Sequence, residues 1–314
     1  MHPCEQVGDG IFAIDTEFVR PRLDACHLVI DAGRAAFIDA GTHLSVPRLL
    51  AALSALDVGV ECVDFVMLTH VHLDHAGGAG RLVAALPTAK VLVHPSGAMH
   101  VLDPSVLVAA TKAVYGEDQF VRQYGDVMGI AAERIVAVED GRRERVGRRT
   151  FELFHTPGHA LHHLCIADRE AGEVFAGDTF GLSYRELDTQ AGEFIFPTTS
   201  PSQFDPVQLH ASIDRIVNYR PSSVYLTHYS RVGHVDELAA ILHRDIDVFV
   251  AIALRAAHLP DRVEHMKPAL FDHLSGRLDA HGYTGGAALR HEVLDGDVAL
   301  NAAGLHSWLN RCRR

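Results

Sequence analysis

Residues 69–78 read Thr-His-Val-His-Leu-Asp-His-Ala-Gly-Gly and follow directly on the apolar run Phe65–Leu68. The stretch holds three imidazoles and one carboxylate, at His70, His72, Asp74 and His75. Neutral imidazoles and a carboxylate suit a borderline cation such as Zn²⁺, and they also bind iron or manganese. Because the short apolar run predicts a strand, these ligands would stand in the loop that leaves it. The stretch therefore predicts a metal site at the end of a buried strand.

The spacing within this loop bears on the number of ions. Alternate side chains of an extended segment point the same way, so we expect His70, His72 and Asp74 to share one side and His75 to face elsewhere. One short loop could then serve two neighbouring ions. The chain has 22 histidines, so chance clustering is the alternative. Ligand density in a single loop followed by glycines, which let the backbone approach closely, favours the metal site.

Size and charge limit the classes of function. The chain of 314 residues could form one large α/β domain or a domain with an appendage. A formal net charge of −12 argues against a nucleic-acid surface, which needs clustered Lys and Arg. The basic cluster at 142–149 is flanked by glycines and precedes a strand-like segment, so we interpret it as a solvated hairpin. We expect a small-molecule substrate, with no nucleic-acid or membrane partner, and leave a homodimer open.

The ends of the chain and its cysteines bear on location. The first residues show neither a basic start nor an apolar segment, and no apolar stretch approaches the ~20 residues that span a bilayer. The five cysteines are scattered, with no Cys-x-x-Cys pair, which fits reduced thiols. A cytoplasmic protein is therefore the expectation.

Ten short apolar runs predict strands in the first two thirds of the chain, at 10–14, 26–30, 35–38, 65–68, 90–93, 135–138, 151–154, 164–167, 174–176 and 224–226. Helical patterns fall at 46–56, 81–86 and 207–217, the last with Asp205 as N-cap and Pro206 in the first turn. This order favours an α/β sandwich of two mixed sheets with helices outside. Periodic segments at 236–259, 268–278 and near 305–309 predict a C-terminal helical extension over 235–314, beyond a catalytic domain of residues 1–234.

Further metal-binding side chains follow predicted strands downstream. His159 closes a His-Thr-Pro-Gly-His motif at 155–159, Asp178 follows the strand at 174–176, and His228 ends the run at 224–228. Loops at one edge of stacked sheets can bring such distant ligands together. With the four in the first loop they make seven candidates.

These motifs, together with Ile-Asp-Ala-Gly at 38–41 and Gly-Asp-Thr at 177–179, occur in an order that resembles the metallo-β-lactamase-fold hydrolases over residues 8–234. The resemblance implies an αββα sandwich with a dinuclear metal site. It assigns the first metal to His70, His72 and His159, the second to Asp74, His75 and His228, and the bridge to Asp178. Asp39 would support a ligand by a hydrogen bond.

The chemistry implied by this resemblance is hydrolysis. Two divalent ions about 3.5–4 Å apart lower the pKa of a bridging water and polarise a substrate carbonyl. Zn²⁺ is the first expectation, with iron or manganese open. Asp74 is the expected catalytic residue that orients the hydroxide.

Within the family, the motifs most resemble the glyoxalase II and lactonase branches. Ala-Leu-His-His at 160–163 departs from the Thr-x-Gly stretch usual in glyoxalase II. Tyr184, six positions after Asp178, resembles a tyrosine of the lactonases, so we expect it to donate to the oxyanion, against the alternative of an ordinary loop tyrosine. The expected substrate is a small thioester, lactone or related ester, selected by residues 181–202 and by the helical tail.

Four other functions are alternatives. A mononuclear iron enzyme resembling the persulfide dioxygenases would use His70, His72 and either Asp178 or His159. An RNA nuclease is disfavoured by the charge, and a non-catalytic binding module by the complete ligand set. β-Lactam hydrolysis is disfavoured because the chain has no secretion signal and has Asp178 where that branch commonly has cysteine. The remaining histidines are interpreted as residues that line or brace the site (His155, His162 and His163) or as surface or packing residues.

Overall fold

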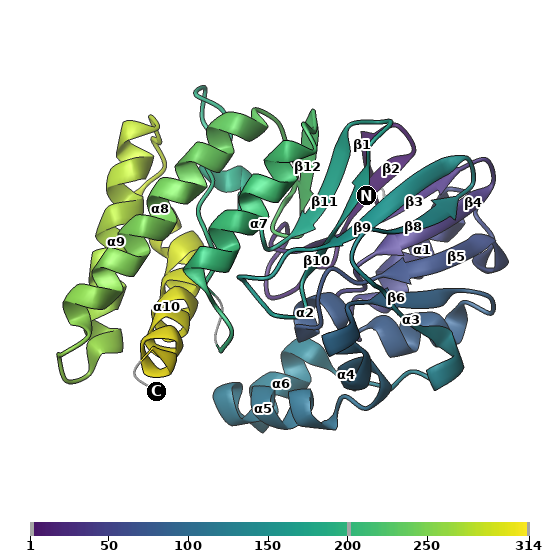
Figure 1. The fold of residues 1–314 in the computed structure, drawn as a ribbon, viewed down its shortest axis with the longest axis horizontal. Helices are drawn as coiled ribbons and strands as arrows, with labels where there is room; N and C mark the ends of the chain where they lie inside the picture. The colour runs from purple at the N-terminus through teal and green to yellow at the C-terminus, as the bar shows by residue number, and fades with distance from the viewer. Residues whose placement is uncertain (1–2, 200–201, 313–314) are drawn as a thin grey trace.

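The computed structural model describes residues 3–199 and 202–312. Two β-sheets face one another with helices on their outer sides, and three long C-terminal helices pack beside the second sheet (Figure 1). This is the predicted sandwich of two mixed sheets with helices outside, followed by a helical extension.

The first sheet has seven strands in sequential order: β1 (Glu5–Gly8), β2 (Ile11–Asp15), β3 (Ala25–Asp31), β4 (Arg34–Ile38), β5 (Val63–Met67), β6 (Lys90–Val93) and β7 (Ile135–Ala137). Neighbours from β1 to β4 are antiparallel and those from β4 to β7 are parallel. Parallel neighbours need crossover connections. These contain α1 (Val46–Ala55), then α2 (Leu73–Ala76) with α3 (Ala79–Ala85), and finally α4 (Ala98–Leu102), α5 (Ser105–Tyr115) and α6 (Glu117–Tyr124).

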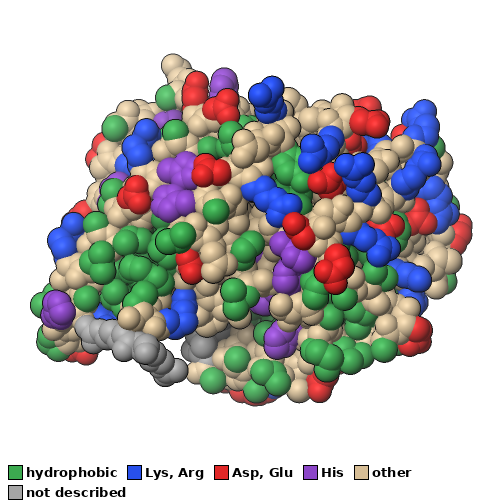
Figure 2. Space-filling view, viewed as in Figure 1, with side chains coloured by type: hydrophobic (Ala, Val, Ile, Leu, Met, Phe, Trp, Pro, Cys, Tyr) green, Lys and Arg blue, Asp and Glu red, His purple; other side chains and the backbone are tan. Residues whose placement is uncertain are grey.

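The second sheet has six strands, β8 (Arg142–Val146), β9 (Arg149–His155), β10 (Leu164–Asp168), β11 (Glu173–Gly177), β12 (Ser223–Leu226) and β13 (Ser230–Val232), in the reverse order β13 to β8. Only β11 and β12 pair in parallel, and α7 (Pro206–Asn218) connects them. Asp205 caps α7 by accepting a hydrogen bond from the Gln208 amide, as its motif predicts. The basic segment at 142–149 contains β8 and the turn of the β8–β9 hairpin. In Figure 2, Lys and Arg side chains gather at the end of the molecule where this hairpin lies.

The sheets enclose one apolar layer, and helices enclose two more. Residues of both sheets meet in the central layer, for example Val29 and Met67 with Phe151 and Phe175. The helices α1 and α3 cover the outer face of the first sheet, and α7 covers that of the second. The sandwich therefore leaves its strand ends, and the loops that follow them, free to form a site.

The extension consists of α8 (Val235–Ala256), α9 (Arg262–Ala280) and α10 (Ala287–Arg311). Two of these helices are longer than predicted. Pro268 suggested a start for α9, but the helix passes through it because Met266, Leu270 and Leu274 are buried on one side. The three helices share one buried cluster with the second sheet. The apolar core is thus continuous across position 234, and the domain boundary there stays a prediction.

Candidate metal centre

All seven predicted ligands lie at one edge of the sandwich, where β5, β9, β11 and β12 end. Four come from the loop after β5 and the short helix α2, and one each from the segments after β9, β11 and β12. The nitrogen and oxygen atoms of these side chains form three overlapping groups, each compact enough to hold a metal ion. The first group is His70, His72 and His159, and the second is Asp74, His75 and His228; the third, His70, His75 and Asp178, overlaps both.

The first group contains only imidazoles. His72 Nδ1 lies 2.8 Å from His70 Nε2 and 3.2 Å from His159 Nε2. Burial lowers the pKa of both His70 and His159 well below the usual range. The two rings are therefore neutral and can offer lone pairs to a cation.

The second group mixes imidazole and carboxylate. Asp74 Oδ2 lies 3.6 Å from His75 Nε2 and 3.7 Å from His228 Nε2. His75 is fully buried, whereas the Asp74 side chain keeps 24% of its surface exposed. Asp74 is thus the member of this group that an entering molecule can reach.

The carboxylate of Asp178 lies between the two groups. Its Oδ2 is 3.4 Å from His159 Nε2, and its Oδ1 is 3.3 Å from His75 Nε2 and 3.6 Å from His228 Nε2. One oxygen therefore faces each group, as a bridging ligand requires.

The donor set fits a pair of divalent cations. His75 Nε2 and Asp178 Oδ1 are buried, and neither has a hydrogen-bond partner among the described residues, although buried polar atoms are nearly always paired. Burial opposes a charge on His75, but the nearby carboxylates of Asp178 and Asp74 raise its pKa well above the usual range. The electrostatic field of the cluster therefore stabilises a positive charge. Imidazoles together with carboxylates are ligands for Zn²⁺, iron or manganese.

Asp39 supports the centre from behind, as the resemblance implies. Its Oδ2 lies 2.9 Å from His75 Nδ1, and both side chains are buried. It also accepts hydrogen bonds from the Thr69 amide and from the hydroxyls of Thr69 and Thr227. These contacts fix the His75 ring with Nε2 toward Asp178.

Two further ligands are held in the same way. His228 Nδ1 lies 2.8 Å from the Leu23 carbonyl, which leaves Nε2 facing the cluster. His163 accepts a hydrogen bond from the Asp178 amide through Nε2, at 3.3 Å, and its Nδ1 lies 2.8 Å from the Thr156 hydroxyl. His163 therefore braces the bridging aspartate.

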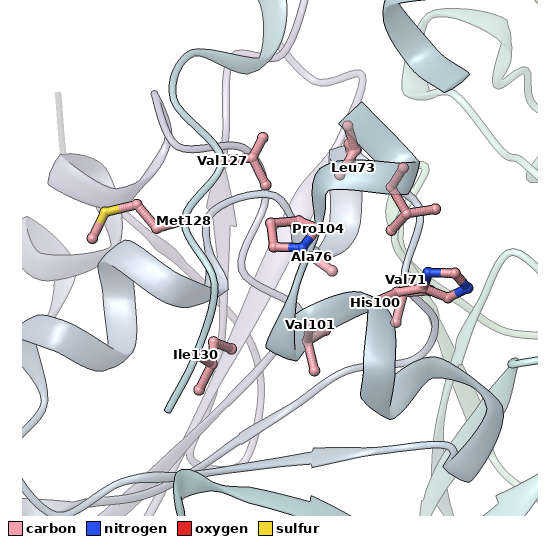
Figure 3. A pocket seen from close by; sticks show the side chains of 10 residues that line it. Val71, Leu73, Ala76, His100, Val101, Pro104, Val127, Met128 and Ile130 are labelled. Carbon is pink, nitrogen blue, oxygen red and sulfur yellow. The ribbon is translucent and has the colours of Figure 1, made fainter. Parts of the chain in front are cut away.

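The alternation predicted for the first loop is wrong at Asp74. His72 is the last extended residue, with φ −62° and ψ 149°, and a turn of helix begins at Leu73. Successive residues of a helix turn by about 100° rather than alternating, so Asp74 and His75 can point into one group. The apolar residues of this loop and of α2, namely Val71, Leu73 and Ala76, line a small pocket together with Val101 and other residues of the α4–α6 region (Figure 3).

Sequence reasoning missed three charged residues near the centre. Asp24 is fully buried with both carboxyl oxygens unpartnered among the described residues, and burial raises its pKa to about 7. Asp297 comes from α10, and burial raises the pKa of its carboxyl to about 6; the Arg20 guanidinium lies 4.7 Å from the Tyr184 ring centre. None of the three belongs to a motif, because tertiary packing alone brings them to the site.

Comparison with known proteins agrees with this geometry. Residues 6–228 match the family model of the metallo-beta-lactamase superfamily, and the chain belongs to that superfamily. A metallo-beta-lactamase fold-containing protein of Sulfurisphaera tokodaii is 26% identical over 230 residues, 72% of this chain and 79% of the relative. The crystal structure of an archaeal superfamily protein from Sulfolobus tokodaii superposes with a TM-score of 0.65 at 22% identity, covering 95% of this chain and 99% of the other.

Two relatives have names that state an activity. An acyl-coenzyme A thioesterase of Bos taurus is 28% identical over 187 residues, 55% of this chain and 64% of the relative. A hydroxyacylglutathione hydrolase of Cupriavidus taiwanensis is 34% identical over 157 residues, 49% of this chain and 47% of the relative. Both matches span less than two thirds of the relative's length.

Among residues 3–199 and 202–312, no helix is long and apolar enough to cross a membrane.

Proposed function

We propose that this protein is a dinuclear metal-dependent hydrolase of a small thioester, lactone or related ester. The observation that carries the proposal is the carboxylate of Asp178, which has one oxygen toward each of two ligand groups. The names of the two relatives, a thioesterase and a hydroxyacylglutathione hydrolase, support a thioester in particular. The acidic net charge and the buried ligands support a small-molecule substrate over a nucleic acid, and a homodimer stays open.

When bound, a pair of divalent ions supplies Lewis-acid activation of water and of the substrate carbonyl. His70, His72 and His159 would hold one ion, Asp74, His75 and His228 the other, and Asp178 both. The partly exposed Asp74 carboxylate accepts a hydrogen bond from the attacking water and orients it toward the substrate. Asp39 and His163 keep the ligands in place while the charge of the site changes.

Tyr184 would assist on the substrate side. It is a fully buried phenol, and its pKa stays well above the usual range because of burial and of Asp297. It therefore keeps its proton at neutral pH and can donate a hydrogen bond to a developing oxyanion.

Metal analysis with a substrate screen tests the proposal. We expect two equivalents of zinc or manganese per chain, and hydrolysis of thioesters or lactones that a chelator abolishes and added metal restores. Asp178→Asn should lose one equivalent of metal and most of the turnover, because a bridging charge disappears. Asp272→Asn, at an exposed position of α9, is the matched control and should behave as wild type.

The same analysis decides the alternative, a mononuclear iron enzyme resembling the persulfide dioxygenases. One equivalent of iron with persulfide-dependent oxygen uptake, and no hydrolysis of any ester, would replace our proposal. The group of Asp74, His75 and His228 favours the dinuclear enzyme, since a single ion on the first group would leave it without a role.

A further inference from the structure

We propose that Arg277, on the extension helix α9, is a positioning residue for the metal ligand His228. It would act through residues 182–199, here called the connecting segment, which contacts both α9 and the backbone of His228. The helical extension would then tune the affinity of the second metal position. This inference rests on the proposed function of the site, because it takes His228 as a ligand.

The backbone of His228 is held by the start of the connecting segment. The His228 carbonyl accepts a hydrogen bond from the Ser183 amide at 2.6 Å, and the Tyr229 amide donates to the Ser183 carbonyl at 3.3 Å. Ser183 is fully buried, so these backbone groups depend on each other rather than on water. The Leu23 carbonyl lies 2.8 Å from His228 Nδ1. Ser183 and Leu23 together therefore determine where the ligand stands.

The connecting segment folds back on itself next to Ser183. Leu182 and Phe196 form an antiparallel bridge, in which each amide donates to the carbonyl of the other residue, at 2.8 Å and 3.1 Å. Both side chains are buried. Gly181 has a φ of 77°, and a β-carbon there would be 2.6 Å from the Phe196 carbonyl oxygen, so the approach is too close for a side chain. A shift of Phe196 is therefore passed through Leu182 to Ser183.

Helix α9 holds the other side of this bridge. The Arg277 guanidinium donates from Nη1 to the Ile195 carbonyl at 2.9 Å, and it lies over the Phe194 ring, 4.6 Å from the ring centre. One turn further along α9, His281 Nε2 lies 3.0 Å from the Gly192 carbonyl. Ile195 directly precedes the bridge. A continuous series of hydrogen bonds thus joins α9 to the backbone of the metal ligand, which is the kind of network that couples distant sites.

A buried acid fixes the Arg277 side chain. Asp245 of α8 is 4% exposed, forms an ion pair with Arg277, and has its Oδ1 3.0 Å from His273 Nε2. A buried ion pair adds little stability compared with apolar side chains of similar volume, because both charges lose their contact with water. We therefore expect this pair to matter chiefly for the arrangement of α8, α9 and the connecting segment.

Helix α10 holds the connecting segment at a separate place. Asn301 is fully buried, and its side-chain oxygen accepts hydrogen bonds from the Thr199 amide at 2.6 Å and from the Thr199 hydroxyl at 3.0 Å. Thr199 lies beyond the bridge and outside the series that leads from Arg277 to His228. A variant at Asn301 therefore loosens the same segment without removing a member of that series.

Metal titration of variants tests the positioning role. Competition with a chromogenic chelator resolves the two binding steps. We expect Arg277→Met to weaken the second step about tenfold and to leave the first within about twofold, because Ile195 loses its donor. The Asp245→Asn/Arg277→Met double variant leaves no unpaired buried charge, so it stays folded if the single variant does not, and it should show the same loss. Arg255→Met, at an exposed position of α8, is the control and should bind both ions as wild type does.

A second control separates positioning from general loosening. Asn301→Ala loosens the far end of the connecting segment and should leave the second binding step within about twofold of wild type. A loss in Asn301→Ala equal to that in Arg277→Met would overturn the positioning role, because loss of stability would explain both.

Hydrogen exchange in the metal-free protein gives a readout that depends on neither metal nor activity. We expect the amides of Leu182, Ser183 and Phe196 to exchange about tenfold faster in Arg277→Met than in wild type, because the bridge opens more often. The Thr69 amide, which donates to Asp39, should not change. Faster exchange with an unchanged second binding step would overturn the inference, because the segment would then move without affecting the ligand.

The inference and the proposed function fail in different ways. If no ester is hydrolysed but Arg277→Met weakens the second binding step, the positioning role is supported and the proposed function fails. If esters are hydrolysed while both binding steps and the exchange rates are unchanged in Arg277→Met, the proposed function is supported and the positioning role is overturned.

Discussion

Asp39 Oδ2 lies 2.9 Å from His75 Nδ1, and each of the two side chains is at most 1% exposed to solvent. When His75 is neutral, as a metal ligand must be, the contact settles which nitrogen carries the proton, because a carboxylate can only accept a hydrogen bond. Nδ1 then donates to Asp39, and the lone pair of Nε2 is left for a cation held with Asp178 and the second ligand group. A residue that binds no metal thereby determines the state of one that would.

Asp39→Asn should weaken binding of the second metal by about 10- to 100-fold, as loss of such supporting contacts commonly does. Asparagine can turn its amide toward His75 and favour the opposite tautomer. Competition with a chromogenic chelator measures both binding steps. Asp57→Asn, in an exposed turn, should change neither. Unchanged affinity in Asp39→Asn would show that the hydrogen bond does not tune the ligand.

Removal of the metal should destabilise the folded chain. In the metal-free protein, Asp178 Oδ1 and His75 Nε2 are buried without a hydrogen-bond partner among the described residues, so a bound cation stabilises the native state. At free metal one thousand times the dissociation constant, the gain is about 4 kcal/mol. Thermal unfolding with and without a chelator measures it. Asp178→Asn should lose most of the metal-dependent increase in Tm, and an equal increase in both proteins would contradict the assigned bridge.

Asn301→Ala should destabilise the protein by about 2–3 kcal/mol, because it leaves the buried Thr199 amide without its partner. Urea unfolding of the metal-free protein measures the loss. Asn218→Ala, at the exposed last position of α7, should stay within about 0.5 kcal/mol of wild type. A loss no larger than this control would mean that α10 is held by its apolar side chains alone.

The strands were largely predictable, and some helices were not. Each of the ten apolar runs matches a strand to within two residues at its ends, because each is short, β-branched or aromatic and ends at a turn residue. The edge strands β1, β8 and β13 were not predicted as strands from apolar pattern, since edge strands have fewer buried positions. The helices α4 to α6 were missed because their burial is slight, with Met99, Val106 and Val121 more than half exposed.

The candidate site divides in the same way. Its seven ligand candidates stand in short motifs directly after strands, so local sequence was sufficient to propose them. Asp24, Asp297 and Arg20 come from segments without ligand spacing, and their nearness to the centre depends on loop and helix packing. No pattern in the single sequence predicts that the face of α10 with Asn301 packs against Thr199.

Acid should selectively remove the contribution of one ion pair far from the centre. Asp31 accepts hydrogen bonds from the Arg148 side chain at 2.7 Å and from its amide at 2.6 Å, which lower the pKa of the carboxyl from 3.8 to about 2. A carboxyl whose pKa is lower in the folded state stabilises that state above its unfolded pKa, and the contribution disappears as the pH falls through the folded value. Asp31→Asn should therefore unfold at a lower temperature than wild type near neutral pH.

The difference in Tm between the two metal-free proteins should shrink as the pH falls from 4 to 2, where wild type also loses the charge. Metal-free protein is needed because acid would otherwise release the metal and mask the effect. Added salt should reduce the difference at neutral pH, since the Arg148 side chain is 80% exposed and the ion pair is screened. A difference that stays constant down to pH 2 would assign the effect of Asp31 to the shape of its turn rather than to its charge.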